Sequence, residues 1–188
     1  MQALERPAFR AALDAYRITR AIGERYAHRA TDRPAASHSP LKLANPPVGL
    51  MFLEGAPRLL DAGVSIPGLH AGDPERVALE AYPALSIRAL THAAHASRAS
   101  YKSDERAKQT PARRQARTAI VTALSDGSGP FRFALGASST LLESLETDAS
   151  GDRLDAVVAA MQAASVCNDR RFGLPEIIDS LEGWIILA

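Results

Sequence analysis

The chain has 188 residues, of which 46% are hydrophobic, and its formal net charge at pH 7 is +1. This length suits one domain with a substantial core, so we expect a single domain over residues 1–188. Because the overall charge is almost zero, only a local basic patch could bind nucleic acid. The single cysteine, Cys167, excludes an internal disulfide and a cysteine-based zinc cluster. There is also no apolar run of about 20 residues. Together these features predict a cytoplasmic protein with no membrane association.

The first part of the chain predicts two helices separated by an ordered loop. Apolar periodicity indicates a helix over residues 7–26, and the segment 28–47 is a loop rich in proline, serine and alanine. Pro47 can begin a second helix. Gly55 and Pro57 should kink or break that helix.

The clearest strand is "RVALEAYP", residues 76–83, in which apolar and other side chains alternate. Glu80 and Tyr82 share one face of this strand. Further along the chain, Thr140 and Glu143 have capping-box spacing ahead of a short helix. The remaining expected elements are helices over residues 84–94, from 111 and over 152–166, with a closing strand over 183–188. Strands separated by helices predict an α/β fold.

Asp152 and Asp155 stand three residues apart at the start of an alanine-rich apolar helix. Residues at this spacing are neighbours on a helix surface. One interpretation is that Asp152 caps the helix and Asp155 interacts with the positive end of its dipole. The other interpretation is that the two carboxylates bind a metal ion.

Glu80 favours the metal interpretation, because a carboxylate on a largely apolar strand is costly unless it is paired or binds a cation. An exposed strand end, or a salt bridge to an arginine, would equally explain it. If Glu80 met Asp152 and Asp155, a divalent cation would relieve their mutual repulsion, and oxygen ligands suit Mg²⁺ or Mn²⁺. Two such ions can catalyse phosphodiester cleavage.

Several segments resemble, in order, the DUF429 family, whose members are described as predicted nucleases with a ribonuclease H-like fold. They are "HRATD", "SPLKLANPPVGLM", "LEAYP", "YKSDERA" and "GDRLDAVVAAMQA" followed by "EGWI". The resemblance runs from about residue 25 to the end of the chain. It implies a mixed sheet flanked by helices, with acidic residues meeting at one edge of that sheet.

By position in these motifs, Glu80 matches the strand carboxylate of the family, and Asp152 and Asp155 match the carboxylates of its last helix. The resemblance implies that these three are both the catalytic residues and the ligands of Mg²⁺ or Mn²⁺. Further motif residues are expected to line the same cleft and bind substrate: His28, Arg29, Asp32, Lys42 and Lys102.

The chain departs from the family pattern at its beginning, where it opens on a helix instead of a Gly-Val-Asp type strand. We therefore expect the N-terminal strands to be missing. Without the aspartate of that strand, little or no hydrolysis is expected. An unpaired sheet edge would also favour a homodimer.

Two functions from different classes stay open. The first is a metal-dependent nuclease or phosphodiesterase, in which Lys42 or Lys102 would steady the phosphate. The second is a non-catalytic α/β domain, or a truncated inactive relative, that binds nucleic acid or a protein partner. The basic segment from Lys102 to Arg117 could hold phosphates, or it could be an ordinary solvated helix face.

Overall fold

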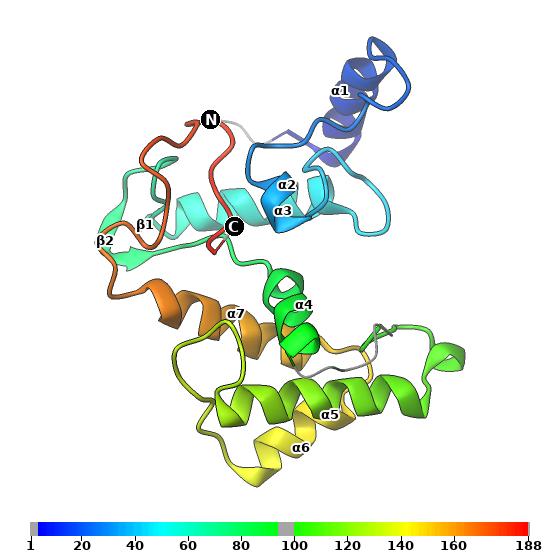
Figure 1. Ribbon diagram of the computed structural model, residues 1–188. Helices are drawn as coiled ribbons and strands as arrows, with labels where there is room; N and C mark the ends of the chain where they lie inside the picture. Colours follow the sequence, from blue (N-terminus) through cyan, green and yellow to red (C-terminus); the bar gives the residue numbers. More distant parts are fainter. Residues whose placement is uncertain (1–3, 94–99, 188) are drawn as a thin grey trace. The chain divides into compact units, whose positions relative to one another are not determined.

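The computed structural model describes residues 4–93 and 100–187 (Figure 1). The chain divides into two compact units. The first comprises Met1–Glu80 and Leu174–Ile186, and the second comprises Ala81–Gly173. A segment near the C-terminus therefore packs with the N-terminal part of the chain. The expectation of a single domain for the whole chain stays a prediction.

The first unit contains three helices and a small sheet within its described residues. The first helix begins where the sequence predicts, with Pro7 in its first turn, but it ends at Ile18 instead of continuing to Tyr26. Pro57 lies inside the third helix without ending it, so a break there is wrong, while the alternative of a kink stays a prediction. A proline removes one hydrogen bond, and the turns on either side hold this helix together. The elements are α1 (Arg6–Ile18), α2 (Asp32–Ala35), α3 (Val48–Asp61), β1 (Val64–Ser65) and β2 (Asp73–Val77).

The strands β1 and β2 pair in parallel, and they are the only strands in the described part of the chain. The predicted strand over residues 76–83 is therefore mostly wrong, since β2 ends at Val77. Beyond it, Glu80 forms an isolated parallel bridge with Ile185, in which the Ile186 N–H donates to the Glu80 carbonyl at 3.0 Å. The closing segment contributes this single bridge, and Ala188 lies outside the described residues. Helices combined with a parallel sheet agree with the expected α/β class, while a larger ribonuclease H-like sheet stays a proposal.

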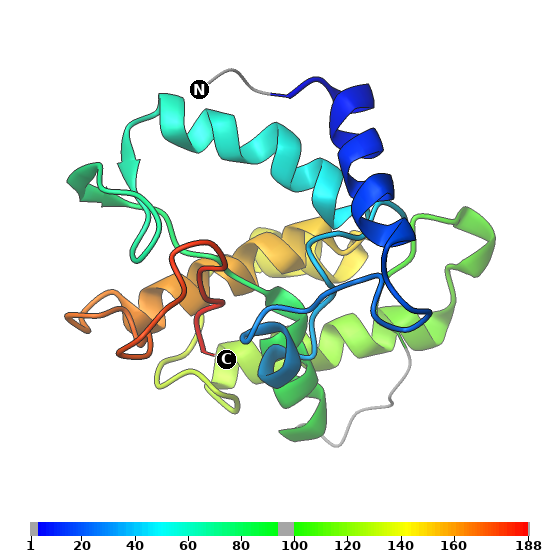
Figure 2. The same cartoon turned by 90° about the horizontal axis from the view of Figure 1, so that it is seen from above.

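The second unit is a cluster of helices, which Figures 1 and 2 show side by side. Helix α4 packs against α5 and α7, and α6 packs against α5 and α7. The positions of these helices agree with the sequence predictions. Ala94, the predicted last residue of the first of them, lies outside the described residues. The elements are α4 (Pro83–Ala93), the 3₁₀ helix η1 (Arg106–Lys108), α5 (Pro111–Asp126), α6 (Ser139–Thr147) and α7 (Asp152–Val166).

The capping of α6 differs from the expected box of Thr140 and Glu143. Ser138 is the N-cap, and its hydroxyl accepts a hydrogen bond from the Leu141 N–H. The helix starts two residues earlier than the Thr140 spacing predicts, because Ser138 already satisfies a free N–H of the first turn.

The helices of the second unit enclose one apolar core. Leu90 of α4, Ile120 of α5, Leu145 of α6 and Leu154 of α7 are all fully buried there. Burial of each such side chain contributes about 1.5–3 kcal/mol, so this core fixes where the first turn of α7 lies. Among the described residues, none of the helices has the length and apolar character needed to cross a bilayer.

Candidate functional site

In the first unit, the guanidinium of Arg29 binds two carboxylates. Its two terminal nitrogens each donate to one oxygen of Glu80, both at 2.7 Å. The same guanidinium donates to Oδ1 of Asp32, at 2.9 Å from Nη2 and 3.2 Å from Nε. Paired contacts of this kind fix the orientation of the groups as well as their distance. The two explanations without a metal ion both fit Glu80, since its side chain is 43% exposed and forms a salt bridge to an arginine.

Asp32 begins α2 and is fully buried. It also accepts hydrogen bonds from the Ser37 hydroxyl at 2.7 Å and from the Arg29 N–H at 2.8 Å. Burial disfavours the charged form of Asp32, but the hydrogen bonds from Arg29 and Ser37 outweigh it and hold the pKa below its usual range. Burial likewise opposes the charge on Arg29, and the contacts with Glu80 and Asp32 outweigh that effect and raise the pKa of Arg29.

The segments that carry Arg29, Glu80 and "EGWI" meet at this cluster. Glu182 contributes its carbonyl oxygen to Arg29 at 3.1 Å, and its carboxylate accepts from the Ala30 N–H at 2.9 Å. Thr31 is buried and accepts a hydrogen bond from the Ile185 N–H at 3.0 Å. Three motifs that are distant in the sequence therefore form one polar cluster. The role of Glu182 was missed from the sequence, although its motif had been singled out.

In the second unit, Asp155 is held by two neighbouring side chains from another segment. The Tyr101 hydroxyl donates to one carboxylate oxygen at 2.5 Å, and the Lys102 ammonium forms an ion pair with the other oxygen. Burial, followed by the hydrogen bond to Asp155, raises the pKa of Tyr101 well above its ordinary value, so the phenol stays protonated and continues to donate. Lys102 and Asp155, both predicted site residues, are therefore brought together. Tyr101 was missed as a site residue.

Two arginines of α5 hold the backbone beside Asp155 in place. Arg117 is buried, and it donates to the carbonyls of Tyr101 and Glu146, both at 2.7 Å. Arg113 donates to the carbonyl of Lys102. The expectation that Lys102 to Arg117 forms either a phosphate-binding patch or a solvated face is therefore only partly right. Arg113 and Arg117 donate hydrogen bonds to backbone carbonyls of the second unit, because carbonyls that are shielded from water need donors.

The start of α7 is built by Asp148 and Gly151, and not by a cap from Asp152. Gly151 is the N-cap residue, and the Asp152 side chain makes no capping hydrogen bond. Asp148 instead accepts from the Arg153 N–H at 2.9 Å and from the Ser150 hydroxyl at 2.7 Å. The capping interpretation of Asp152 is therefore wrong. Its exposed carboxylate has no hydrogen bond or ion pair within residues 4–93 and 100–187.

The three predicted carboxylates are divided between the two units. Glu80 belongs to the first unit, whereas Asp152 and Asp155 belong to the second. The meeting of all three therefore stays a prediction. Within the described residues, no group of three or more His, Cys, Asp or Glu side chains is arranged to hold a metal ion.

The other predicted substrate-binding residues lie in the first unit. Arg29 and Asp32 pair with each other, whereas His28 and Lys42 line a pocket beside α1. His28 is 3.9 Å from Asp32 through its Nδ1 atom, which links the pocket loosely to the Arg29 cluster.

Replacement of Asp32 by Asn should destabilise the first unit. It leaves part of the charge of Arg29 without its buried partner, so we expect a loss of about 3 kcal/mol at pH 7. Because the pKa of Asp32 is lowered by folding, its stabilising contribution is complete above the unfolded-state pKa of about 4 and is lost as the pH falls through the folded-state value. Urea unfolding at pH 7 and near pH 3 measures this. Asp61→Asn, an exposed change on α3, is the control, and an equal loss for both variants would contradict the account.

Replacement of Gly151 by Ala should destabilise the second unit. Gly151 has φ +74°, and an added Cβ would lie 2.8 Å from Cβ of Lys102 and 3.1 Å from Cε2 of Tyr101. Strain and overpacking together should cost about 3 kcal/mol. Chemical unfolding measures the effect, with Gly136→Ala as the control because open space surrounds that glycine. A stability loss below about 1 kcal/mol would show that the close approach to Tyr101 and Lys102 is unimportant.

Comparison with known proteins gives one match. The model of a family described as "Protein of unknown function (DUF429)" matches residues 10–177. No curated protein and no solved structure matches the chain. The match covers most of the sequence, including Arg29, Asp32, Glu80, Tyr101, Lys102 and Asp155, but it ends before the "EGWI" segment. The chain therefore belongs to the DUF429 family.

Proposed function

We propose that the protein is a metal-dependent phosphodiesterase that acts on nucleic acid, and that Asp152 and Asp155 hold Mg²⁺ or Mn²⁺ at the start of α7. The observation that carries this proposal is the contact of Asp155 with Tyr101 and Lys102, one helical turn from the exposed Asp152. Acidic groups for a cation and a basic group for a phosphate are thus neighbours within the second unit. The ribonuclease H-like fold implied by the family resemblance is part of the same proposal.

The two carboxylates have the donor chemistry that such an ion needs. Each oxygen of Asp155 accepts one hydrogen bond or ion-pair contact, and a carboxylate oxygen can accept two. Asp155 is 23% exposed and Asp152 is exposed, so both can be reached from solvent. Mg²⁺ is usually bound by only one or two carboxylates and keeps several water molecules. The pair at the start of α7 fits this coordination.

The side chains around Asp155 would have separate tasks. Tyr101 stays protonated and fixes the orientation of the carboxylate. Lys102 is 40% exposed, so its ammonium can contact a phosphate oxygen as well as Asp155. When bound, a divalent cation would lower the pKa of a water molecule and offset the charge that develops on the phosphodiester.

One observation favours the second function, non-catalytic binding of nucleic acid or a protein partner. The charge of Asp155 is already matched by Lys102. A carboxylate with a cationic partner gains less from a metal ion than one without such a partner. Weak metal binding would therefore point to the passive function.

Titration with Mn²⁺ tests the metal site. We expect binding by the wild-type protein, and a loss of affinity of at least about 100-fold in both Asp152→Asn and Asp155→Asn, because each change removes a ligand. Isothermal titration calorimetry measures the affinity. Any cleavage of labelled RNA and DNA in Mn²⁺, which we expect to be slow, should fall in parallel.

Glu143→Gln is the matched control, since it removes one exposed carboxylate from α6 in the same unit. It should bind Mn²⁺ like the wild type. If the wild-type protein binds no Mn²⁺, or if Asp155→Asn cleaves nucleic acid as fast as the wild type, the proposed function is wrong.

A further inference from the structure

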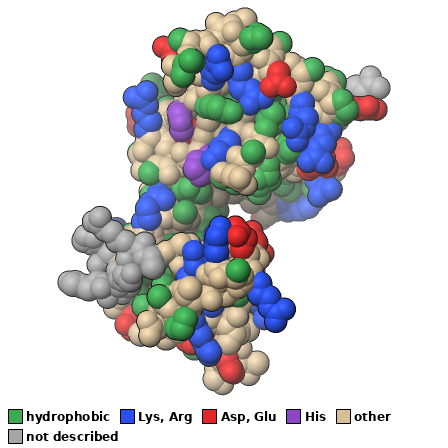
Figure 3. Space-filling view, turned by 90° about the vertical axis from the view of Figure 1, so that its right-hand side faces the viewer, with side chains coloured by type: hydrophobic (Ala, Val, Ile, Leu, Met, Phe, Trp, Pro, Cys, Tyr) green, Lys and Arg blue, Asp and Glu red, His purple; other side chains and the backbone are tan. Residues whose placement is uncertain are grey.

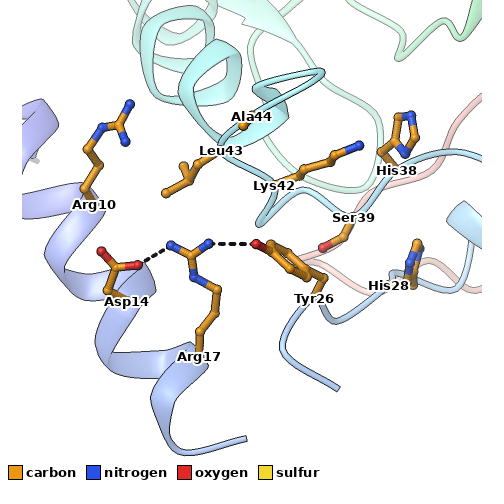
Figure 4. Close-up of a pocket in the computed structure, with 10 residues that line it drawn as sticks. All are labelled: Arg10, Asp14, Arg17, Tyr26, His28, His38, Ser39, Lys42, Leu43 and Ala44. Carbon is orange, nitrogen blue, oxygen red and sulfur yellow. Dashed lines mark hydrogen bonds and ion pairs between the residues drawn. The ribbon is translucent and has the colours of Figure 1, made fainter. Parts of the chain in front are cut away.

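The first unit contains a pocket of about 500 Å³ between α1 and the loop that precedes α3 (Figure 4). This volume falls within the range of about 300–1,000 Å³ that is typical of small-molecule sites. Arg10, Asp14 and Arg17 of α1 line one side, and Lys42 and His38 line the other. The face of the first unit seen in Figure 3 likewise carries histidine side chains among lysine and arginine side chains.

The charges in this pocket are not balanced. Arg17 pairs with Asp14, so those two charges cancel. Arg10 and Lys42 have no acidic partner among residues 4–93 and 100–187. Desolvation, followed by the positive charges of Lys42 and His28, lowers the pKa of His38, which is the effect expected in an electropositive site. Two unmatched cations suit a dianion such as a phosphate monoester.

The pocket also offers apolar contacts. Leu43 points toward α1, and Tyr26 is 45% exposed at the pocket wall. The Tyr26 hydroxyl accepts a hydrogen bond from Arg17 at 3.1 Å, which fixes the ring beside the charged groups. A free phosphate ion would leave most of the 500 Å³ unfilled, whereas an aromatic base attached to the phosphate could stack on the ring.

The loop that carries Lys42 is fixed by its own hydrogen bonds. The Gly49 N–H at the start of α3 donates to the Lys42 carbonyl at 2.8 Å, and the Lys42 N–H donates to the Ser39 carbonyl at 3.2 Å. Ser39 is buried, and its hydroxyl donates to the Ala27 carbonyl at 2.6 Å. A ligand would therefore meet a preformed loop on this side of the pocket and lose little affinity to ordering of that loop.

From this geometry we propose that the pocket binds a nucleoside monophosphate, with its phosphate held by Arg10 and Lys42 and its base stacked on Tyr26. This site lies wholly within the first unit and requires no hydrolysis by the protein. It is therefore independent of the metal site at Asp152 and Asp155.

Calorimetry with AMP, adenosine and inorganic phosphate tests the proposal. AMP should bind, while adenosine and inorganic phosphate should each bind at least about tenfold more weakly, because each lacks one half of the contacts. Arg10→Gln and Lys42→Gln should each weaken AMP binding at least about tenfold, since each removes a charged hydrogen-bond donor. Tyr26→Ala should weaken the binding of AMP but not that of inorganic phosphate.

Arg58→Gln is the matched control, because Arg58 is an exposed arginine on α3 outside this pocket. It should bind AMP like the wild type. The thermal unfolding curve of each variant checks that the first unit remains folded. Absence of AMP binding, equal binding of adenosine or inorganic phosphate, or unchanged AMP binding in folded Arg10→Gln and Lys42→Gln variants would each overturn the proposal.

Discussion

The fold of the first unit depends on one ion pair, in which the buried carboxylate of Asp32 is matched by the positive charge of Arg29. Asp32 is fully buried at the start of a helix of only four residues. Such a short helix has little stability of its own. The guanidinium of Arg29 holds it by binding Asp32, and the same group reaches Glu80 and the carbonyl of Glu182. One side chain thus joins three segments of the chain, and the first unit has few large buried apolar residues that could do so instead.

The second unit uses the same principle with a different cation and with more apolar support. Lys102 pairs with Asp155, but the first turn of α7 is already placed by a core that includes Leu154 and Ile120. The ion pair can therefore be partly exposed without any cost to the fold. This difference bears on function, because an exposed, exchangeable partner such as Lys102 suits a site for ligands, whereas Arg29, which is only 16% exposed and binds two carboxylates, suits a structural role. It is the reason that the proposed chemistry is assigned to Asp155 rather than to Glu80.

Helices whose ends depend on neighbouring residues could be predicted from the sequence. Contacts between residues that lie far apart in the sequence could not. The start of α7 and of α5 followed from apolar periodicity and from Pro111, which act over a few residues. The alternation in "RVALEAYP" predicted a strand, yet a strand needs a partner: Val77 still pairs with Ser65 at the end of β2, and beyond it Glu80 forms a single bridge, with Ile185. For the site, the sequence identified both Lys102 and Asp155 but not their pairing, since 53 positions separate them. An arginine partner for Glu80 was one of three explanations, beside a metal ion and an exposed strand end, and nothing local distinguished Arg29 from the other basic residues.

Whether a basic side chain has an acidic partner also distinguishes the residues of the pocket beside α1. The basic groups of Arg29, Lys102 and Arg17 each have an acidic partner, and these contacts serve the fold. Exposed basic side chains such as Arg58 have no acidic partner among the described residues, but an unpaired charge in water hardly lowers the stability of the fold. Arg10 is likewise exposed, but it and the half-buried Lys42 line the same concave pocket. Asp14, the one described acidic residue that lines the pocket, is engaged with Arg17, so Arg10 and Lys42 leave the pocket with a net positive charge. An anionic ligand would match this excess of positive charge, which no other described side chain in the pocket does.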